Sequence, residues 1–246
     1  MVLDHFVIHI DDDPAILDAL KSRLGAHGVP FEPGWGKGTK GFKAANIWIG
    51  RQYFEIMRIL RPDGGGWVPH WVERHHQGRR GLYCIFLKTG RLNEIAENLR
   101  ATDIAIKGPE RIIYRALLGL LKKPMPWRVL YLPPVPGTDL EFGFIEYDPG
   151  LEAQLKSHMV PNAEENGITG ISDARLCLPL SDEARSFLLR LFPGARGTAN
   201  GMTVSLAEGS IHIENAGHVH AHFHAKSEDA GRKTGAVTLE NVTLHL

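Results

Sequence analysis

The spacing of apolar and polar residues at the start of the chain predicts a strand followed by a helix. Residues 3–10, "LDHFVIHI", are rich in β-branched and aromatic side chains and end at an acidic turn. Residues 11–28 then place Leu17, Leu20 and Leu24 on one helical face, between an aspartate cap and the stop at Gly25. A short strand at 29–32 and two apolar runs at 41–50 and 52–60, joined by a hairpin turn, complete the order strand, helix, three strands.

The same order recurs along the chain, which predicts an internal repeat. A second unit has a strand at 81–89, a helix at 90–101, a short strand at 103–106 and a hairpin at 127–148. A third, weaker unit has a strand at 168–180, a helix capped by Ser181 and strands at 202–206 and 210–215. Two tail strands, 218–227 and 236–246, flank a polar turn.

These repeats predict an α+β fold of βαβββ units. We expect residues 1–150 to form a domain of two units, 1–60 and 81–148, joined by the linker 61–80. Residues 151–246 would hold the third unit and the C-terminal strands. The third unit could pair with the tail strands, with the first two units or with another subunit, and the last case predicts a homodimer.

Two stretches depart from the repeat. The linker 61–80 is Gly-rich, and its basic part, 73–80, is expected to be solvated. The alternative is an anion site, or a metal ligand donated by His70, His75 or His76. Residues 109–126 have the pattern of an amphipathic helix with basic flanks, packed on the core or on a partner subunit. A lid over a pocket and a membrane-surface helix are the other interpretations.

Composition narrows the classes of partner. The 246 residues include 28 basic side chains (Lys plus Arg) and 28 acidic ones (Asp plus Glu). The chain therefore has no overall electrostatic field that would attract nucleic acid or an anionic membrane. A small, roughly neutral molecule is the expected partner. The N-terminus lacks the features of a signal peptide, and no apolar run reaches the length of a membrane span, which predicts a cytoplasmic protein. Cys84 and Cys177 lie in apolar runs and are expected to be reduced thiols.

The order of the motifs resembles the vicinal oxygen chelate superfamily, which includes glyoxalase I, extradiol dioxygenases and bleomycin-resistance proteins. The chain is most similar to the glyoxalase-like domain family. The matching pieces are "LDHFVIHIDD", "GKGTKGFKAANIWIG" with "QYFEIM", "PWRVLYL" before "FGFIEYD", and "NGITGISDARLCL". They extend over residues 1–215.

The resemblance implies that the units curl into half-open, mixed-sheet barrels. It also implies a divalent metal, Zn, Ni, Mn or Fe, held by residues that point into the barrel. His5 matches the first-strand histidine ligand, and Glu55 matches the last-strand glutamate. In the second unit, Tyr83 and Glu141 fall at the corresponding positions. Because tyrosine is a poor ligand for Zn or Ni, a complete ligand set is not visible, and a metal-free member is the alternative. In the third unit, Asp173 and His212 take these positions, which makes His212 a further metal candidate.

Other side chains are expected to contact the substrate. Glu55, in an apolar strand, would need a cation or a raised pKa, which suits a general base, and Glu141 is the second catalytic candidate. Tyr83, Trp48 and Phe144 are expected in the pocket wall, together with Lys43. The "GKGTKG" at 36–41 fits a dinucleotide-binding spacing, but a strand follows it instead of the required helix.

The histidine row of "HVHAHFHA", residues 218–225, predicts the outer face of a strand, with Val219, Ala221 and Phe223 turned inward. The functional hypothesis is a metal-dependent lyase, isomerase or dioxygenase-type enzyme acting on a small carbonyl or hydroxyl compound. One alternative is a metal-free ligand-binding or sequestering protein of the bleomycin-resistance type. A third is a structural or metal-storage protein built around the tail histidines.

Overall fold

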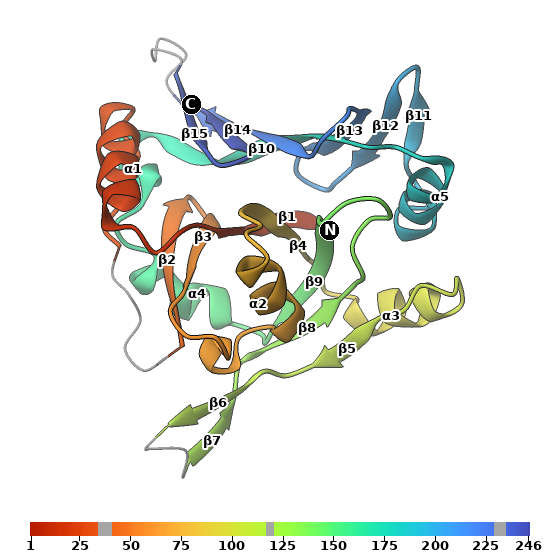
Figure 1. Cartoon of the computed structure of the whole chain (residues 1–246), viewed down its shortest axis with the longest axis horizontal. Helices are drawn as coiled ribbons and strands as arrows, with labels where there is room; N and C mark the ends of the chain where they lie inside the picture. The colour runs from red at the N-terminus through yellow and green to blue at the C-terminus, as the bar shows by residue number, and fades with distance from the viewer. Residues whose placement is uncertain (34–40, 117–120, 229–234) are drawn as a thin grey trace.

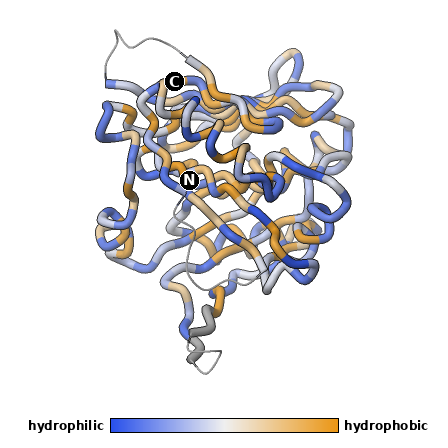
Figure 2. Tube along the Cα trace, turned by 60° about the vertical axis from the view of Figure 1, so that its left-hand side comes forward, coloured by the Kyte–Doolittle hydropathy of each residue, from blue (hydrophilic) through white to orange (hydrophobic). Residues whose placement is uncertain are grey.

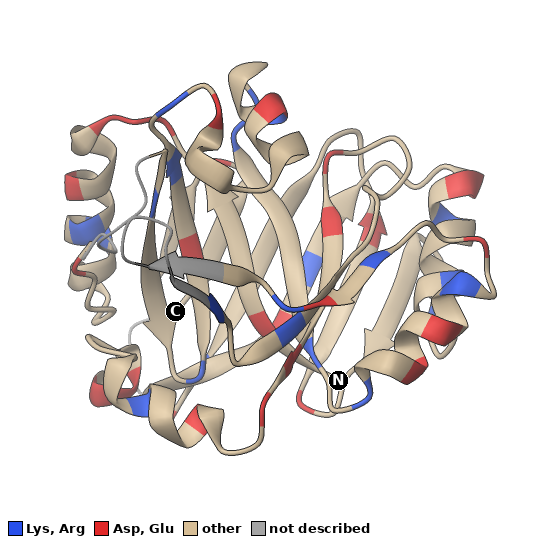
Figure 3. Cartoon of the chain, turned by 90° about the horizontal axis from the view of Figure 1, so that it is seen from below, with Lys and Arg blue, Asp and Glu red and all other residues tan. Residues whose placement is uncertain are grey.

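The chain forms two seven-stranded sheets that lie one above the other as two layers (Figure 1). The structure is a computed structural model, and it describes residues 1–33, 41–116, 121–228 and 235–246. Apolar side chains from both sheets form one continuous core, which appears as orange trace where the layers meet in Figure 2. Acidic and basic side chains are mixed over the helices and loops, as the balanced composition predicts (Figure 3).

The first sheet has the strand order β2-β3-β1-β4-β9-β8-β5. Its strands are β1 (Val2–His9), β2 (Phe42–Ile49), β3 (Gln52–Ile59), β4 (Gly81–Lys88), β5 (Lys107–Glu110), β8 (Trp127–Tyr131) and β9 (Glu141–Tyr147). Its helices are α1 (Pro14–Ala26), α2 (Pro69–His76), α3 (Leu92–Arg100) and α4 (Leu151–Leu155), with short 3-10 turns η1 (Gly64–Gly66), η3 (Lys156–His158) and η4 (Ala163–Asn166).

The second sheet has the order β11-β12-β13-β10-β14-β16-β15. It contains β10 (Ile168–Leu178), β11 (Arg196–Thr198), β12 (Gly201–Ser205), β13 (Ser210–Asn215), β14 (His220–Ser227), β15 (Ala236–Leu239) and β16 (Val242–His245), with helix α5 (Asp182–Leu191). Ser181 caps α5 by accepting a hydrogen bond from the Ala184 amide, as the sequence predicts.

The two sheets are built on the same pairing pattern. In the first, β1 is parallel to β3 and antiparallel to β4, which is parallel to β9. In the second, β10 is parallel to β13 and antiparallel to β14, which is parallel to β16. The third unit therefore closes on the tail strands. The α+β fold with its repeated units is confirmed. The short strands expected at 29–32 and 103–106 are wrong, because these residues belong to no strand and β5 begins at Lys107.

Several predicted elements differ from the structure. The amphipathic helix expected at 109–126 is wrong, because this stretch contributes β5 and the protruding hairpin β6 (Ile113–Ala116) and β7 (Leu121–Pro124). Its adjacent isoleucines are β-branched, and prolines stand at both of its ends, which disfavours a helix. The single strand expected at 236–246 is the hairpin β15–β16, which turns at Glu240 with φ of 53°.

The linker 61–80 is not an irregular connection. It folds into η1 and α2, and Trp71, Val72 and His75 of α2 are buried against the first sheet. Most of its basic part, 73–80, is exposed as expected. In Figure 1, α2 lies in front of that sheet. The Gly-rich composition suggested a loop, but a tryptophan and a valine within one helical turn gave the segment an apolar face to bury.

Candidate functional site

The candidate site lies on the face of the first sheet that is turned away from the second sheet, here called the inner face. Residues paired in register on neighbouring strands point to the same side of a sheet. Val7 is paired with Glu55 on β3 and with Cys84 on β4, and Cys84 is paired with Glu141 on β9. Glu55 and Glu141 therefore stand in one row across the inner face, with Val7 and Cys84 between them.

His5 stands in the next row of the inner face. Its ring is stacked between those of Tyr53 and Phe86, with centroids 4.7 and 4.3 Å away. The β1–β4 ladder changes register between Leu3 and His5, so Asp4 is the extra residue of a β-bulge. The bulge lets Asp4 and His5 meet, and Nδ1 of His5 lies 2.7 Å from Oδ1 of Asp4.

Asp4 in turn is held by Tyr147, whose hydroxyl donates to Asp4 Oδ1 at 2.9 Å. Burial and the neighbouring Asp4 carboxylate raise the pKa of Tyr147, so its hydroxyl stays protonated. Tyr147 thus fixes Asp4, and Asp4 fixes the ring of His5. Within the described residues, Nε2 of His5 makes no hydrogen bond, so this atom is available to a ligand.

Glu55 is a second polar side chain of the inner face. Its side chain is half-buried, and in the described part of the chain its carboxylate accepts no hydrogen bond and forms no ion pair. Burial raises the pKa of Glu55, while the nearby His5 opposes this shift. A carboxylate with a raised pKa suits proton transfer near neutral pH.

The residues do not fit a metal ion held by the protein alone. Among the residues that the structure describes, no group of three or more His, Cys, Asp and Glu side chains is arranged to hold a metal. His5 and Glu55 are neighbours on the inner face, but Nδ1 of His5 is already bonded to Asp4. Two ligands fall short of the three or four protein ligands that Zn sites use.

Glu141 is fully buried beneath α2. Its carboxylate accepts hydrogen bonds from Nε2 of His70 at 3.0 Å and Nε1 of Trp71 at 2.9 Å, and it lies 3.1 Å from Nη1 of Arg74. All three donors belong to α2. The carboxylate that was predicted as a second catalytic group thus fastens this helix to the inner face.

The remaining predicted site residues are dispersed. Trp48 packs on Tyr53 at the inner face, with centroids 4.4 Å apart, and Tyr83 is stacked on His9 beneath α2 at 3.9 Å. Phe144 lies in the core between the sheets. Strand alternation turns Lys43 to the side opposite Trp48. Most of the "GKGTKG" stretch falls outside the described residues.

His212 has the same place in the second sheet that Glu55 has in the first. Val7 is paired with Glu55, and Arg175 is paired with His212 in the equivalent ladder. The ring of His212 is bonded to the hydroxyls of Thr203 at 3.2 Å and Ser210 at 2.8 Å. This position lies on the face of the second sheet away from the core, far from His5.

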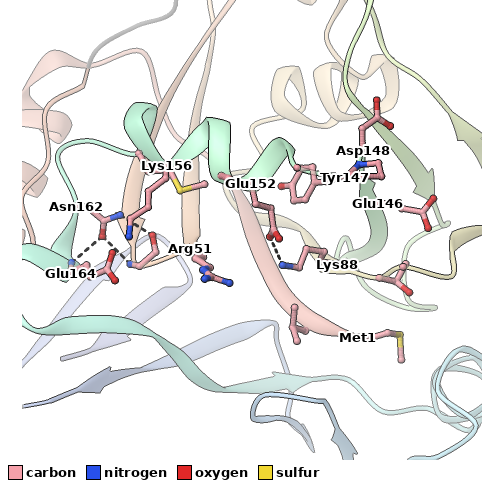
Figure 4. A pocket seen from close by; sticks show the side chains of 18 of the residues that line it. Met1, Arg51, Lys88, Glu146, Tyr147, Asp148, Glu152, Lys156, Asn162 and Glu164 are labelled. Carbon is pink, nitrogen blue, oxygen red and sulfur yellow. Dashed lines mark hydrogen bonds and ion pairs between the residues drawn. The ribbon is translucent and has the colours of Figure 1, made fainter.

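A pocket of about 1030 Å³ opens beside the inner face and shares Tyr147 with the site (Figure 4). Three of its carboxylates are ion-paired, as Lys88 with Glu152, Arg128 with Glu146 and Arg111 with Asp148. The amide side chain of Asn162 donates to the Gly50 carbonyl at 2.8 Å and accepts from the Gly50 amide at 2.9 Å. These bonds fasten the segment after α4 to the β2–β3 turn and so fix the pocket wall.

The sequence reasoning missed Asp4, Tyr147 and the whole of α2. Asp4 stands beside His5 in the "LDH" motif, but strict alternation would have turned it to the other face, and only the bulge brings it in. The signal for α2 was the pair Trp67 and Trp71 in a segment that was otherwise polar.

Comparison with known proteins agrees with the fold. No protein-family model matches the chain, and no curated protein matches its sequence. A hypothetical protein from Staphylococcus aureus has a similar structure, with 14% identity over 99% of this chain and 97% of that one, at a TM-score of 0.72.

Shorter structures give weaker similarities. Methylmalonyl-CoA epimerase from Mycobacterium tuberculosis matches 62% of this chain and 91% of its own, with 15% identity and a TM-score of 0.42. A hypothetical protein from Bacillus halodurans matches 59% of this chain and 94% of its own, with 20% identity and a TM-score of 0.41. Neither carries an argument about function. The similarity to the Staphylococcus aureus protein over nearly the whole of both chains shows a shared fold. The resemblance of the motifs to the vicinal oxygen chelate superfamily stays a prediction.

Proposed function

We propose that the protein is an enzyme that moves a proton on a small carbonyl or hydroxyl compound bound at the inner face. One observation carries this proposal. Nε2 of His5 and the carboxylate of Glu55 are neighbours on one face, and in the described residues neither has a protein partner. Free polar groups placed together in this way suit a ligand that supplies the missing contacts.

His5 and Glu55 would act as the base and the acid. If Asp4 accepts the Nδ1 proton of His5, the lone pair of His5 lies on Nε2, where it can remove or return a proton. Glu55, with its raised pKa, serves as the second proton carrier. Burial also raises the pKa of Tyr53, so the Tyr53 hydroxyl can donate a hydrogen bond to a substrate oxygen.

A divalent metal stays part of the hypothesis only with ligands from outside the chain. Such an ion would polarise the substrate oxygen. Its coordination by His5 and Glu55 would have to be completed by water or substrate, so no step is assigned to it.

The test is hydrogen–deuterium exchange in heavy water. A panel of small ketones, hydroxy acids and oxo acids is incubated with the protein, and loss of the proton next to the carbonyl is followed by NMR. We expect catalysed exchange of at least one compound, with a loss of 100-fold or more in His5→Gln and in Glu55→Gln, in line with general acid–base catalysis (on the order of 10²–10⁴). Parallel samples with chelator and with added Zn, Ni, Mn or Fe test the metal.

The second candidate is a ligand-binding or sequestering protein. Aromatic rings favour it, since Trp48, Tyr53 and Phe86 surround His5 on the inner face. Saturable binding of a panel compound would support this candidate if its proton exchange is no faster than in His5→Gln and Glu55→Gln. The same result would contradict the enzyme.

A further inference from the structure

The pocket shown in Figure 4 adjoins the inner face at His5. Tyr147 lines the pocket, and its hydroxyl donates to Oδ1 of Asp4 at 2.9 Å. Nδ1 of His5 lies 2.7 Å from the same oxygen atom. The pocket wall and the ring of His5 therefore both contact one atom of Asp4, so a molecule in the pocket lies next to the inner face.

The strand β3 leads from the reacting groups into the pocket. Tyr53 is paired with His5, and Arg51, which lines the pocket, stands two residues before Tyr53. Glu55 stands two residues after Tyr53, so the order along the chain is Arg51, Tyr53, Glu55. From the spacing and rise of strands, the backbones of His5 and Arg51 are about 8 Å apart. The pocket thus continues the inner face on the side of His5 that is away from Glu55.

Arg51 brings an uncompensated positive charge into this pocket. Figure 4 shows its guanidinium pointing into the pocket, between Asn162 and Lys88. Within the described residues, Arg51 makes no hydrogen bond and no ion pair. Lys88 differs, because its ammonium is paired with Glu152. A ligand group at Arg51 would therefore be its first partner.

The other charges of the pocket restrict this ligand group to a single negative charge. Lys156 and Glu164 form no ion pair in the described part of the chain, and Figure 4 shows both at the end of the pocket near Asn162. Glu165, also unpaired among the described residues, lines the pocket as well. A doubly charged phosphate would be repelled by the two glutamates. A carboxylate has one charge, and its two oxygens match two parallel N–H donors of one guanidinium.

The size of the pocket indicates how the carboxylate is attached to the substrate. Sites for small molecules have volumes of roughly 300–1,000 Å³, and this pocket has about 1030 Å³. In pyruvate the carboxylate is bonded directly to the carbonyl carbon, which is too short to join Arg51 to His5. A ring or a chain between the two groups spans this separation, and Met159 and Val160 give the pocket an apolar wall to contact it.

We propose that Arg51 binds the carboxylate of a substrate whose carbonyl or hydroxyl group reacts at His5 and Glu55. The inference rests on the proposed function for the reacting end of the molecule. The substrate class is a carbonyl or hydroxy compound with a remote carboxylate, and the pocket holds the ring or chain that separates the two groups.

The experiment is a calorimetric binding titration, which does not need turnover. The probe is para-acetylbenzoate, which has a ketone and a carboxylate on opposite sides of a ring. Its uncharged match is para-acetylbenzamide, and pyruvate is the short acid. We expect saturable binding of para-acetylbenzoate, with at least tenfold weaker binding of the amide and of pyruvate. Arg51→Gln should weaken binding of the acid at least tenfold, because a hydrogen bond between two charged groups is lost.

A matched variant and an NMR measurement locate the bound acid. Arg61→Gln changes an exposed arginine near the other end of β3 and should bind the acid as the unchanged protein does. Met159 lines the pocket, whereas Met202 lies in the core. With methyl-labelled methionine, the Met159 resonance should shift as para-acetylbenzoate is added, and the Met202 resonance should stay in place.

The proposal is overturned if para-acetylbenzoate does not bind, if the amide or pyruvate binds equally well, or if Arg51→Gln keeps full affinity. Binding that leaves the Met159 resonance unchanged overturns it too. The proposed function is tested separately, by exchange of the acetyl protons of the same probe in heavy water. Binding that depends on Arg51 without such exchange keeps the carboxylate site and contradicts the enzyme. Exchange that depends on His5 and Glu55 but not on Arg51 has the opposite meaning.

Discussion

At the residue scale, Glu55 shows how a site can cost stability. Its carboxylate is half-buried and has no hydrogen-bond partner in the described residues, and burial raises its pKa. The folded protein therefore holds a proton at Glu55 at pH values where the unfolded chain has released it. By linkage, stability falls as pH rises above about 4.5, the ordinary pKa of this group, and the loss is complete above the raised folded pKa.

Glu55→Gln should remove this loss. Below pH 4 the variant and the unchanged protein should have similar melting temperatures, and toward pH 7 the variant should become the more stable one. Thermal unfolding followed by circular dichroism from pH 4 to 8 measures the difference. Glu165→Gln, on an exposed glutamate, is the control. A difference that stays constant over this range would mean that the carboxylate of Glu55 has a partner.

At the element scale, the histidines of β14 form a cluster with His245 of β16. The predicted orientation is confirmed, since Ala221 and Phe223 are buried while the histidines lie on the other face. Nδ1 of His222 is 3.0 Å from Nε2 of His245, and the rings of His224 and His245 are stacked 4.5 Å apart. Protonation would bring like charges together on one small area of the sheet.

The cluster should make stability fall in acid. Burial, and then neighbouring histidines, lower the pKa of His220, His222 and His245, and Arg175 also acts on His222. The unfolded chain binds these protons more readily, so stability is lost as pH falls below about 6.5. His222→Gln should flatten the dependence of melting temperature on pH between 7 and 5, whereas the exposed His158→Gln should not. Equal slopes in both variants would contradict the coupling.

At the scale of the whole molecule, the two sheets stabilise each other. Phe223 of the second sheet is fully buried between them, 4.1 Å from the ring of Phe6 and 5.2 Å from that of Phe54. Side chains of residues 1–150 and of residues 151–246 belong to one core. The division of the chain into two domains at this boundary stays a prediction. None of the described helices has the length and apolar character needed to cross a membrane.

Phe223→Ala should therefore destabilise both sheets, by about 3–5 kcal/mol, as is usual for a buried phenylalanine. The tryptophans in the described part of the chain are Trp48, Trp67, Trp71 and Trp127, which lie in the first sheet or in the segment packed on it, so their fluorescence reports on this sheet. In urea, the fluorescence and circular dichroism transitions should shift together to lower concentration. Lys226→Ala, exposed on the same strand, should leave them in place. A fluorescence transition that does not move in Phe223→Ala would show two independent domains.

The sequence by itself determined the repeat, the α+β class and most strands of both sheets, because periodicity and turn residues act over a few neighbours. The resemblance of its motifs to a known superfamily singled out His5 and Glu55, and Glu55 is also conspicuous as a carboxylate in an apolar strand. It misjudged residues 109–126, where β-branched residues and prolines outweigh a helical spacing of apolar side chains.

Tertiary structure alone decided how these groups meet. A one-residue bulge turned Asp4 toward His5, and the packing of α2 used the carboxylate of Glu141 to bind His70, Trp71 and Arg74. The pairing of the third unit with the tail strands was settled in the same way. Each of these outcomes depends on contacts between residues far apart in the chain, and local patterns of polarity contain no record of such contacts.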